Sequence, residues 1–311
     1  MGHVLRRIAA TLPVVAFVAV LVFLLVRLAP GDPAALIAGD LASIDDIARL
    51  RIQLGLDQPL WRQFALWLGR VATGDLGTSI FTQVPVTQLI AQRLEPTVSI
   101  AVLTMVLTLA LAVPLGTFAA CRAGTWPDRL VMLLVVLGAS VPVFLIGYLL
   151  ILAFAIRLPW FPVQGYVHLL NDPAAWLRSL MLPCVTLALV YGAVMTRMTR
   201  AAVLDVLPED YIRTARAKGL GAFGVLMHAL RNAALPIVTS VGVAATLLIG
   251  GVVVTESVFA IPGIGRLVVD SVSRRDYPVI QGVLLVCAVA VVSINLLVDL
   301  SYQFFDPRVR H

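Results

Sequence analysis

The chain has 311 residues, of which 60% are hydrophobic and 13% are charged, and its formal net charge is +6. A soluble domain carries about 25% charged residues, so this composition excludes a soluble globular protein and indicates a membrane protein. The cysteines Cys121, Cys184 and Cys287 lack the spacing of a metal site or a disulfide framework, so we expect no cysteine chemistry.

Six apolar intervals without a charged residue are long enough to cross a bilayer, which takes roughly 20 residues in a helix. A seventh, 76–92, is rich in Gly, Thr and Gln and contains Pro85, so we predict no span there. The first interval is too long for a typical signal peptide, and prolines follow it where a cleavage site would lie, which favours a retained helix. The six intervals are 8–26, 96–121, 130–156, 179–196, 232–255 and 277–298.

Six spans place both termini on one side of the membrane. If that side is the cytoplasm, its segments hold twelve basic and five acidic residues, whereas the outer segments hold eleven of each. This asymmetry follows the positive-inside rule, so we predict cytoplasmic termini. The net positive charge is then explained by topology and does not indicate nucleic-acid binding.

The first outer segment, 29–95, shows two amphipathic patterns. Ser43 to Asp46 resembles a helix capping box, and apolar residues follow it at helical spacing. A second apolar stripe begins after Pro59. Two short surface helices are predicted, which either cover the outer face of the bundle or dock a partner. The two stripes are Ile44, Ile47, Leu50 and Leu54, and Leu60, Phe64, Leu68 and Val71.

The other outer segments carry aromatic residues and a tight turn. Segment 157–178 contains Trp160, Phe161, Tyr166 and Trp176, a composition that favours an interfacial aromatic belt over a role in stacking on a substrate. The third outer segment contains the run from Ile261 to Gly265, in which Pro262, Gly263 and Gly265 predict a tight turn.

The cytoplasmic loop 197–231 has the composition of a docking element. A helix is predicted from Pro208, followed by a break at Gly219 and Gly221 and a second helical piece over 223–230. Pro236 is expected to open the fifth span. Ala215, Ala217 and Gly219 make a smooth surface beside basic residues, which fits contact with a soluble partner better than membrane anchoring alone.

Several kinds of chemistry are missing from the sequence. Lys218 is followed by Gly219, so this chain's one lysine cannot complete a phosphate-binding P-loop. All four histidines lie outside the predicted spans, which argues against an intramembrane protease. Glu256 and Asp299 lie at the edges of spans, where local hydrogen bonding is favoured over proton coupling. No catalytic residue, metal site or cofactor is expected, and the chain resembles a passive conduit driven from outside the membrane.

Loop 209–231 resembles the "EAA" loop of ABC-importer permeases, in the form found in the dipeptide, oligopeptide and nickel permease family. Further similar motifs follow one another along essentially the whole chain. The glutamate that gives the loop its name is replaced by Arg213, so a salt bridge through that glutamate is not implied. The other motifs are 28–33, 55–60, 74–79, 255–259, 262–265, 275–281 and 306–310.

The resemblance implies an all-α, type I ABC importer permease fold with a long first periplasmic loop. It also implies a second permease subunit, an external solute-binding protein and two ATPase subunits, which bind ATP and Mg²⁺. This chain would then be a transport subunit in the bacterial inner membrane and not an enzyme. The implied ATPase-coupling residues are Arg213, Thr214, Ala215, Arg216, Ala217, Lys218, Gly219 and Leu220. Those implied on the binding-protein or gate side are Asp32, Asp75, Glu256, Pro262, Gly263 and Gly265.

We divide the chain accordingly. Residues 1–28 hold the cytoplasmic N-terminus and first span, 29–95 the periplasmic loop, 96–303 the permease core and 304–311 a cytoplasmic tail. Within the core, the spans are 96–121, 130–156, 179–196, 236–255 and 277–303, and the coupling loop is 197–235.

Peptide-class cargo, meaning di- or oligopeptides or glutathione-like molecules, is the preferred interpretation. Segments 36–63 and 267–281 resemble the dipeptide and glutathione branches most. A nickel or nickel-chelate importer is the alternative. A secondary carrier, which would depend on a coupling carboxylate such as Glu256, and a scaffold subunit that binds partners without transport remain as hypotheses from other classes.

Overall fold

The computed structural model describes residues 2–28, 34–35, 43–53 and 55–305. These residues form helices and connecting segments, and the described part of the chain contains no β-strand beyond an isolated bridge between Thr78 and Pro85. They divide into two compact units. The first unit comprises Met1–Leu94 with Leu267–Val292, and the second comprises Glu95–Arg266 with Ser293–His311.

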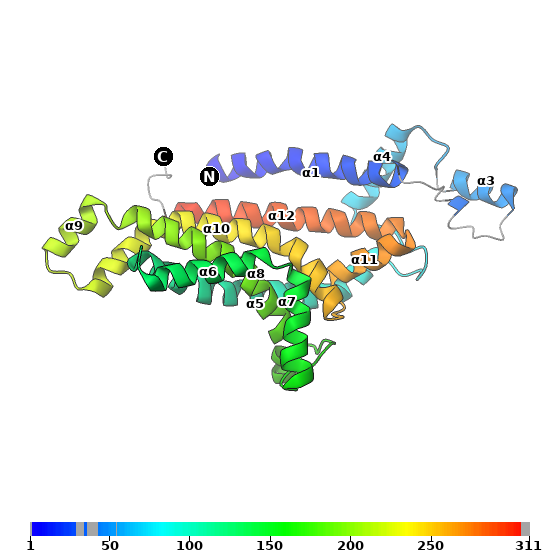
Figure 1. Cartoon of the computed structure of the whole chain (residues 1–311). Coiled ribbons are helices and arrows are strands. Elements are labelled where there is room, and N and C mark those ends of the chain that lie inside the picture. The colour runs from blue at the N-terminus through cyan, green and yellow to red at the C-terminus, as the bar shows by residue number, and fades with distance from the viewer. Residues whose placement is uncertain (1, 29–33, 36–42, 54, 306–311) are drawn as a thin grey trace. The chain divides into compact units, whose positions relative to one another are not determined.

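The first unit contains α1 (Gly2–Leu28), α3 (Ile44–Gln53) and α4 (Leu60–Ala72). Figure 1 shows α4 beside the C-terminal end of α1. Phe23 of α1 and Trp67 of α4 are both buried, and their ring centroids lie 5.8 Å apart. This aromatic contact is the centre of a small apolar core that fixes α4 against α1.

Both predicted surface helices of the 29–95 segment are present. The capping box before α3 is confirmed, because the Ser43 hydroxyl donates to the Asp46 carboxylate at 2.6 Å and the Asp46 N–H donates back at 3.2 Å. The packing face of α4 includes Phe64 and Val71 of the predicted stripe, but not all of the stripe. Gln63 and Trp67 are its buried residues, whereas Leu60 and Leu68 are exposed. Arg27 of α1 attracts Gln63 into the interface by hydrogen bonding, which an apolar pattern does not reveal.

The second unit is built mainly from long helices that pack side by side. The helices that lie wholly within it are α6 (Trp126–Ser140), α7 (Val143–Leu150), the π-helix η1 (Ile151–Arg157), α8 (Pro173–Val206), α9 (Asp210–Ala217) and α10 (Ala222–Val258). Three further helices contribute residues to both units: α5 (Val86–Cys121), α11 (Ile264–Arg274) and α12 (Tyr277–Phe305).

Among the described residues, four helices are long and apolar enough to cross a membrane, or five if α6 and α7–η1 together make one span. That pair is bent by 102° (Figure 1). Pro142 explains the bend, because a residue before proline is forced out of the helical region and Val141 is extended, with φ −88° and ψ 130°. Helix α1 contains a shorter apolar stretch, Thr11–Leu25, so the six-span count remains a prediction.

The loop predicted at 197–235 is mostly helical. Helix α8 continues to Val206, and α10 runs without interruption from Ala222 to Val258 with Pro236 inside it. The separate helical piece predicted over 223–230 is therefore wrong, because these residues belong to α10, and the start of the fifth span at Pro236 stays a prediction. Proline inside a long apolar helix is tolerated where neighbouring groups satisfy the freed backbone atoms.

Close packing and a partly buried ion pair link helices of the second unit. A Cβ at Gly116 of α5 would lie only 2.6 Å from the Thr196 carbonyl oxygen of α8, so glycine allows these two helices to approach. The Arg200 guanidinium of α8 donates two hydrogen bonds to the Asp128 carboxylate of α6, at 2.6 and 2.8 Å. Asp128 is buried, so this pair is a specific cross-link between α6 and α8.

The aromatic residues of segment 157–178 lie in two environments. Trp160 is exposed, whereas Phe161, Tyr166 and Trp176 pack against the largest apolar core of the second unit. Burial raises the pKa of Tyr166 above its ordinary value, so this phenol stays neutral while donating to the Glu95 carboxylate at 3.0 Å. Three of the four aromatic residues thus contribute to packing, and the predicted interfacial belt stays a prediction.

Candidate functional sites: the coupling segment and the Glu256 cluster

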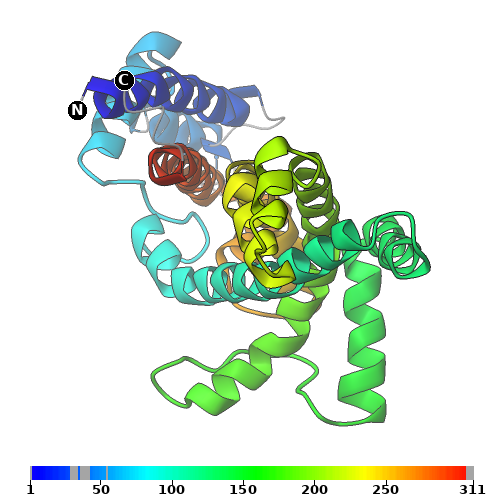
Figure 2. The same ribbon diagram turned by 90° about the vertical axis from the view of Figure 1, so that its left-hand side faces the viewer.

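The coupling segment, residues 209–231, comprises α9 and the beginning of α10. It lies at the end of the second unit where α8 finishes, and in Figure 2 it faces the viewer. Next to the coupling segment, buried Val203 of α8 packs with Ala233 and Ile237 of α10 in one apolar cluster. The segment is therefore attached directly to the ends of two long helices.

A helix-terminating motif shapes the turn between α9 and α10. The Gly219 N–H donates to the Arg216 carbonyl at 3.0 Å, and the Leu220 N–H donates to the Ala215 carbonyl at 3.2 Å. These two bonds make a Schellman motif, in which the residue after the cap takes a left-handed conformation. Gly219 has φ +81°, so glycine is needed there for backbone geometry.

A single buried side chain anchors α9. Ile212 is completely buried and packs with Val225 and Ala229 of α10. Ala215 is half-buried, and the remaining predicted coupling residues are exposed. The helix thus presents nearly all of its surface outward, as a docking element must. The exposed coupling residues are Arg213, Thr214, Arg216, Ala217, Lys218, Gly219 and Leu220.

The charges of α9 are solvated and available for contact. The Arg213 guanidinium lies 3.1 Å from the Asp210 carboxylate, and both side chains are largely exposed, so this pair is worth little in stability. Burial and the nearby Glu209 carboxylate raise the pKa of Tyr211 above its ordinary value, which keeps the phenol neutral. The segment therefore presents a neutral tyrosine beside exposed basic side chains.

The Glu256 cluster, formed by Glu256 with Thr97 and residues 263–266, lies at the other end of α10. Glu256 is completely buried. The Thr97 hydroxyl donates to Glu256 Oε1 at 2.5 Å, and the Arg266 N–H donates to Oε2 at 3.0 Å. The Ile264 N–H in turn donates to the Thr97 oxygen at 2.8 Å. The carboxylate thereby caps the first turn of α11, where negative charge is favourable.

Two glycines leave the space that the Glu256 carboxylate occupies. A Cβ at Gly263 would lie 2.0 Å from Glu256 Oε1, and a Cβ at Gly265 would lie 2.5 Å from the Val253 Cα atom. Pro262, between Ile261 and Gly263, is exposed and lies in the connecting turn. The sequence therefore predicted the turn correctly. Its glycines make room for a buried carboxylate.

The structure brings together only part of the predicted gate-side set. Glu256, Gly263 and Gly265 are in contact, and the Thr97 hydroxyl donates a hydrogen bond to Glu256. Thr97 was not predicted as a site residue, because a single threonine in an apolar helix can have many roles. Asp75 belongs to the first unit, where its Oδ1 atom accepts a hydrogen bond from the Gly77 N–H at 2.8 Å. Asp32 lies outside the described residues.

Metal binding and cargo contact are not indicated at these positions. Within the described ranges no group of three His, Cys, Asp or Glu side chains is arranged to hold a metal ion. The Glu256 carboxylate is enclosed by protein and cannot touch a solute in this conformation. Its arrangement suits a positioning role, in which it fixes the turn between α10 and α11.

Known proteins are similar over the full length of the chain. The model of the family described as "Binding-protein-dependent transport system inner membrane component" matches residues 112–311, and the model of that family's N-terminal region matches residues 1–101. A protein of Sinorhizobium fredii named "Probable peptide ABC transporter permease protein" is 51% identical over 310 residues, which cover 99% of both chains.

A second relative is the glutathione transport system permease protein of Salmonella paratyphi A. It is 45% identical over 312 residues, covering all of this chain and 99% of the relative. Family models that together span nearly the whole chain, and full-length identity of this degree, agree with the apolar helices of a multi-pass inner-membrane protein. The chain belongs to the family of inner-membrane components of binding-protein-dependent transport systems, the permeases of ABC importers.

Proposed function

We propose that this chain is the permease subunit of an ATP-driven importer for di- or oligopeptides or glutathione-like peptides. The observation that carries the proposal is the 45–51% identity, over the whole chain, to relatives named as peptide and glutathione permeases. Neither of these relatives is named for nickel, so the nickel alternative is not favoured.

The energy for transport would come from other subunits. The sequence lacks a Gly-Lys-Ser/Thr phosphate loop, because its one lysine is Lys218 and Gly219 follows it. We infer two cytoplasmic ATPase subunits that bind ATP and Mg²⁺, a second homologous permease and an extracytoplasmic solute-binding protein. Six spans with both termini in the cytoplasm would place the coupling segment on the ATPase side.

The coupling segment is proposed as the ATPase-docking site. Its exposed small and basic residues can approach a partner closely, while Ile212 fixes α9 to α10. A displacement of α9 by the ATPase subunits would move the ends of α8 and α10 together with it. ATP binding and hydrolysis could then switch the pathway between outward and inward states. Cargo-loaded binding protein can stimulate this cycle only if it binds one state more tightly.

The Glu256 cluster is proposed to hold the gate-side turn and not to couple ions. Its carboxylate accepts hydrogen bonds from Thr97 and Arg266, which stabilises one arrangement of the turn. A secondary carrier would instead require Glu256 to titrate during transport. Uptake that requires Glu256 but not the ATPase subunits would support the carrier and exclude the importer.

Uptake measurements test the cargo directly. Cells with and without this gene would receive labelled dipeptide, labelled glutathione or labelled nickel. We expect gene-dependent uptake of a peptide that stops when ATP is depleted. Gene-dependent uptake of nickel alone would overturn the peptide assignment. Partner binding without uptake of any of the three would favour the scaffold hypothesis.

A further inference from the structure

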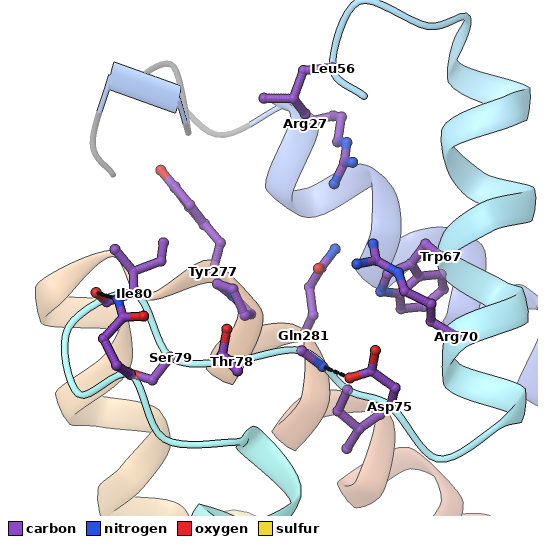
Figure 3. A pocket seen from close by; sticks show the side chains of 14 residues that line it. Arg27, Leu56, Trp67, Arg70, Asp75, Thr78, Ser79, Ile80, Tyr277 and Gln281 are labelled. Atoms are coloured by element: carbon purple, nitrogen blue, oxygen red, sulfur yellow. Dashed lines mark hydrogen bonds between the residues drawn. The ribbon is translucent and has the colours of Figure 1, made fainter. Parts of the chain in front are cut away.

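A cavity of about 320 Å³ lies within the first unit, between α1, α4, the connecting segment 75–83 and the beginning of α12. Figure 3 shows side chains from all three helices reaching into this space. Nothing in the coupling segment or the Glu256 cluster contributes to it. The lining residues that matter here are Arg27, Trp67, Arg70, Asp75, Tyr277 and Gln281.

Two arginines of the cavity come from different helices. Arg27 is placed by two hydrogen bonds to Gln63 Oε1, at 3.2 and 2.9 Å, and by its position 4.3 Å above the Phe23 ring. Arg70 extends from α4 into the same space (Figure 3), and the two like charges repel each other there. An arrangement that holds two guanidinium groups close together is stabilised when an anion binds between them.

The remaining charge of the cavity indicates what kind of anion fits. Asp75 also lines it, so the three side chains together carry a net charge of +1. Within the described part of the chain, neither Arg27 nor Arg70 forms a salt bridge. A phosphodiester carries one negative charge and oxygen atoms that match the planar fork of arginine, so it would neutralise the cavity.

The position of the cavity along the apolar helices favours a lipid as the source of that phosphodiester. Arg27 follows the apolar stretch Thr11–Leu25, and Tyr277 begins the apolar stretch Tyr277–Ser301. The ends of such stretches lie at the level of the lipid headgroups, whichever face of the membrane is concerned. Helix α4 also exposes Leu60, Trp61 and Leu66, as a helix resting on a membrane surface would.

We propose that this cavity binds the headgroup of a membrane phospholipid, with its phosphodiester held by Arg27 and Arg70. Gln281 and Tyr277 would contact the headgroup beside the phosphate, and Trp67 would form the apolar wall of the cavity. The bound lipid would link α1 and α4 to the beginning of α12. This inference depends on the chain being a membrane protein and is independent of its cargo.

The test measures lipid binding to the purified, delipidated importer complex in detergent. Dioctanoyl phosphatidylglycerol and dioctanoyl phosphatidylethanolamine would be titrated separately and the complexes counted by native mass spectrometry. We expect saturable binding that Arg70→Gln weakens about tenfold, which corresponds to about 1.4 kcal/mol, because the variant loses a charge-assisted hydrogen bond to the phosphate. Arg27→Gln should have a similar effect.

The matched control is Arg62→Gln, which removes another exposed arginine of α4. Arg62 donates to Gln58 Oε1 at 2.9 Å and does not line the cavity, so this variant should bind lipid like the parent protein. The proposal would be overturned if all variants bound lipid with the same affinity, or if Arg62→Gln lost as much lipid affinity as Arg70→Gln. Arginine-dependent binding of inorganic phosphate or dialanine without lipid binding would assign the cavity to a soluble anion and overturn the lipid assignment. Because Arg70 is exposed on α4, Arg70→Gln keeps the test valid even if Arg27→Gln fails to fold.

Discussion

The coupling segment and the Glu256 cluster lie near opposite ends of α10 and are stabilised in contrasting ways. In the coupling segment one buried residue, Ile212, anchors a helix whose other side chains are mostly exposed. In the Glu256 cluster the carboxylate is fully buried and both oxygen atoms accept hydrogen bonds. The first arrangement leaves surface for a partner, whereas the second leaves none. Substitutions should therefore damage partner coupling at one end and folding at the other.

The largest effect on folding is expected from Gly265→Ala. The new Cβ would lie 2.5 Å from the Val253 Cα atom, so the turn must move away from α10. Overpacking of this kind costs about 1–3 kcal/mol, which lowers the melting temperature by roughly 2–10 °C. Thermal unfolding of the purified protein checks this result. The control is Gly250→Ala on α10, where a new Cβ would have no neighbouring atom within 4 Å, and it should leave the melting temperature unchanged or slightly higher.

A loss of folding stability of similar size is expected from Glu256→Ala. Removing the carboxylate leaves the Arg266 N–H and the Thr97 hydroxyl without this acceptor, at a cost of about 1–3 kcal/mol. Glu256→Gln keeps one acceptor oxygen and should be intermediate in melting temperature. It should also retain ATP-dependent uptake. If Glu256→Gln were as stable as the parent protein yet inactive, a chemical role for the carboxylate would replace the positioning role.

Gly219→Asp should uncouple the complex while leaving most of the folding stability intact. Space does not limit this position, because a Cβ at Gly219 meets nothing within 4 Å. The constraint is the left-handed backbone, which costs roughly 1–2 kcal/mol in a residue with a side chain. We expect loss of binding-protein-stimulated ATPase activity. Gly221→Asp is the control, because Gly221 has φ −64° and equal space, and it should retain more stimulation. Identical stimulated ATPase activity in both variants would argue against a role of the Gly219 turn in coupling.

The smallest effect on stability is expected from Arg213→Gln. The Arg213–Asp210 pair is exposed, so its loss should change the free energy of unfolding by less than about 1 kcal/mol. If Arg213 meets an acidic group of an ATPase subunit, the variant should nevertheless bind that subunit more weakly. A titration of ATPase subunits onto the reconstituted permease separates the two quantities. An unchanged affinity for the ATPase subunit would show that Arg213 is not part of the docking surface.

The sequence predicted local features better than contacts between distant residues. The capping box at Ser43 and the turn at Gly219 depend on neighbouring residues, and both were recovered. The partnership of Thr97 with Glu256 joins residues 159 positions apart, and no local pattern encodes it. The burial of Gln63 on α4 was missed for the same reason, since Gln63 is held by Arg27 of another helix.

Two prolines in apolar segments have different effects on helix continuity. Pro142 changes the conformation of the residue before it and produces the bend between α6 and α7, although the apolar composition alone predicted one continuous span there. Pro236 resembles a helix boundary in the sequence but lies inside α10. Whether proline interrupts a long apolar helix depends on the packing around it, and composition does not describe that packing.

The most direct test of the account is whether ATPase subunits bind through α9. Ala215→Trp adds bulk to the proposed docking helix, whereas Ala65→Trp adds the same bulk at an exposed position of α4. Co-purification of ATPase subunits with each tagged permease variant would be measured against the parent protein. We predict that Ala215→Trp loses most of the ATPase while Ala65→Trp retains it. Equal retention by the two variants would contradict the assignment of the coupling segment.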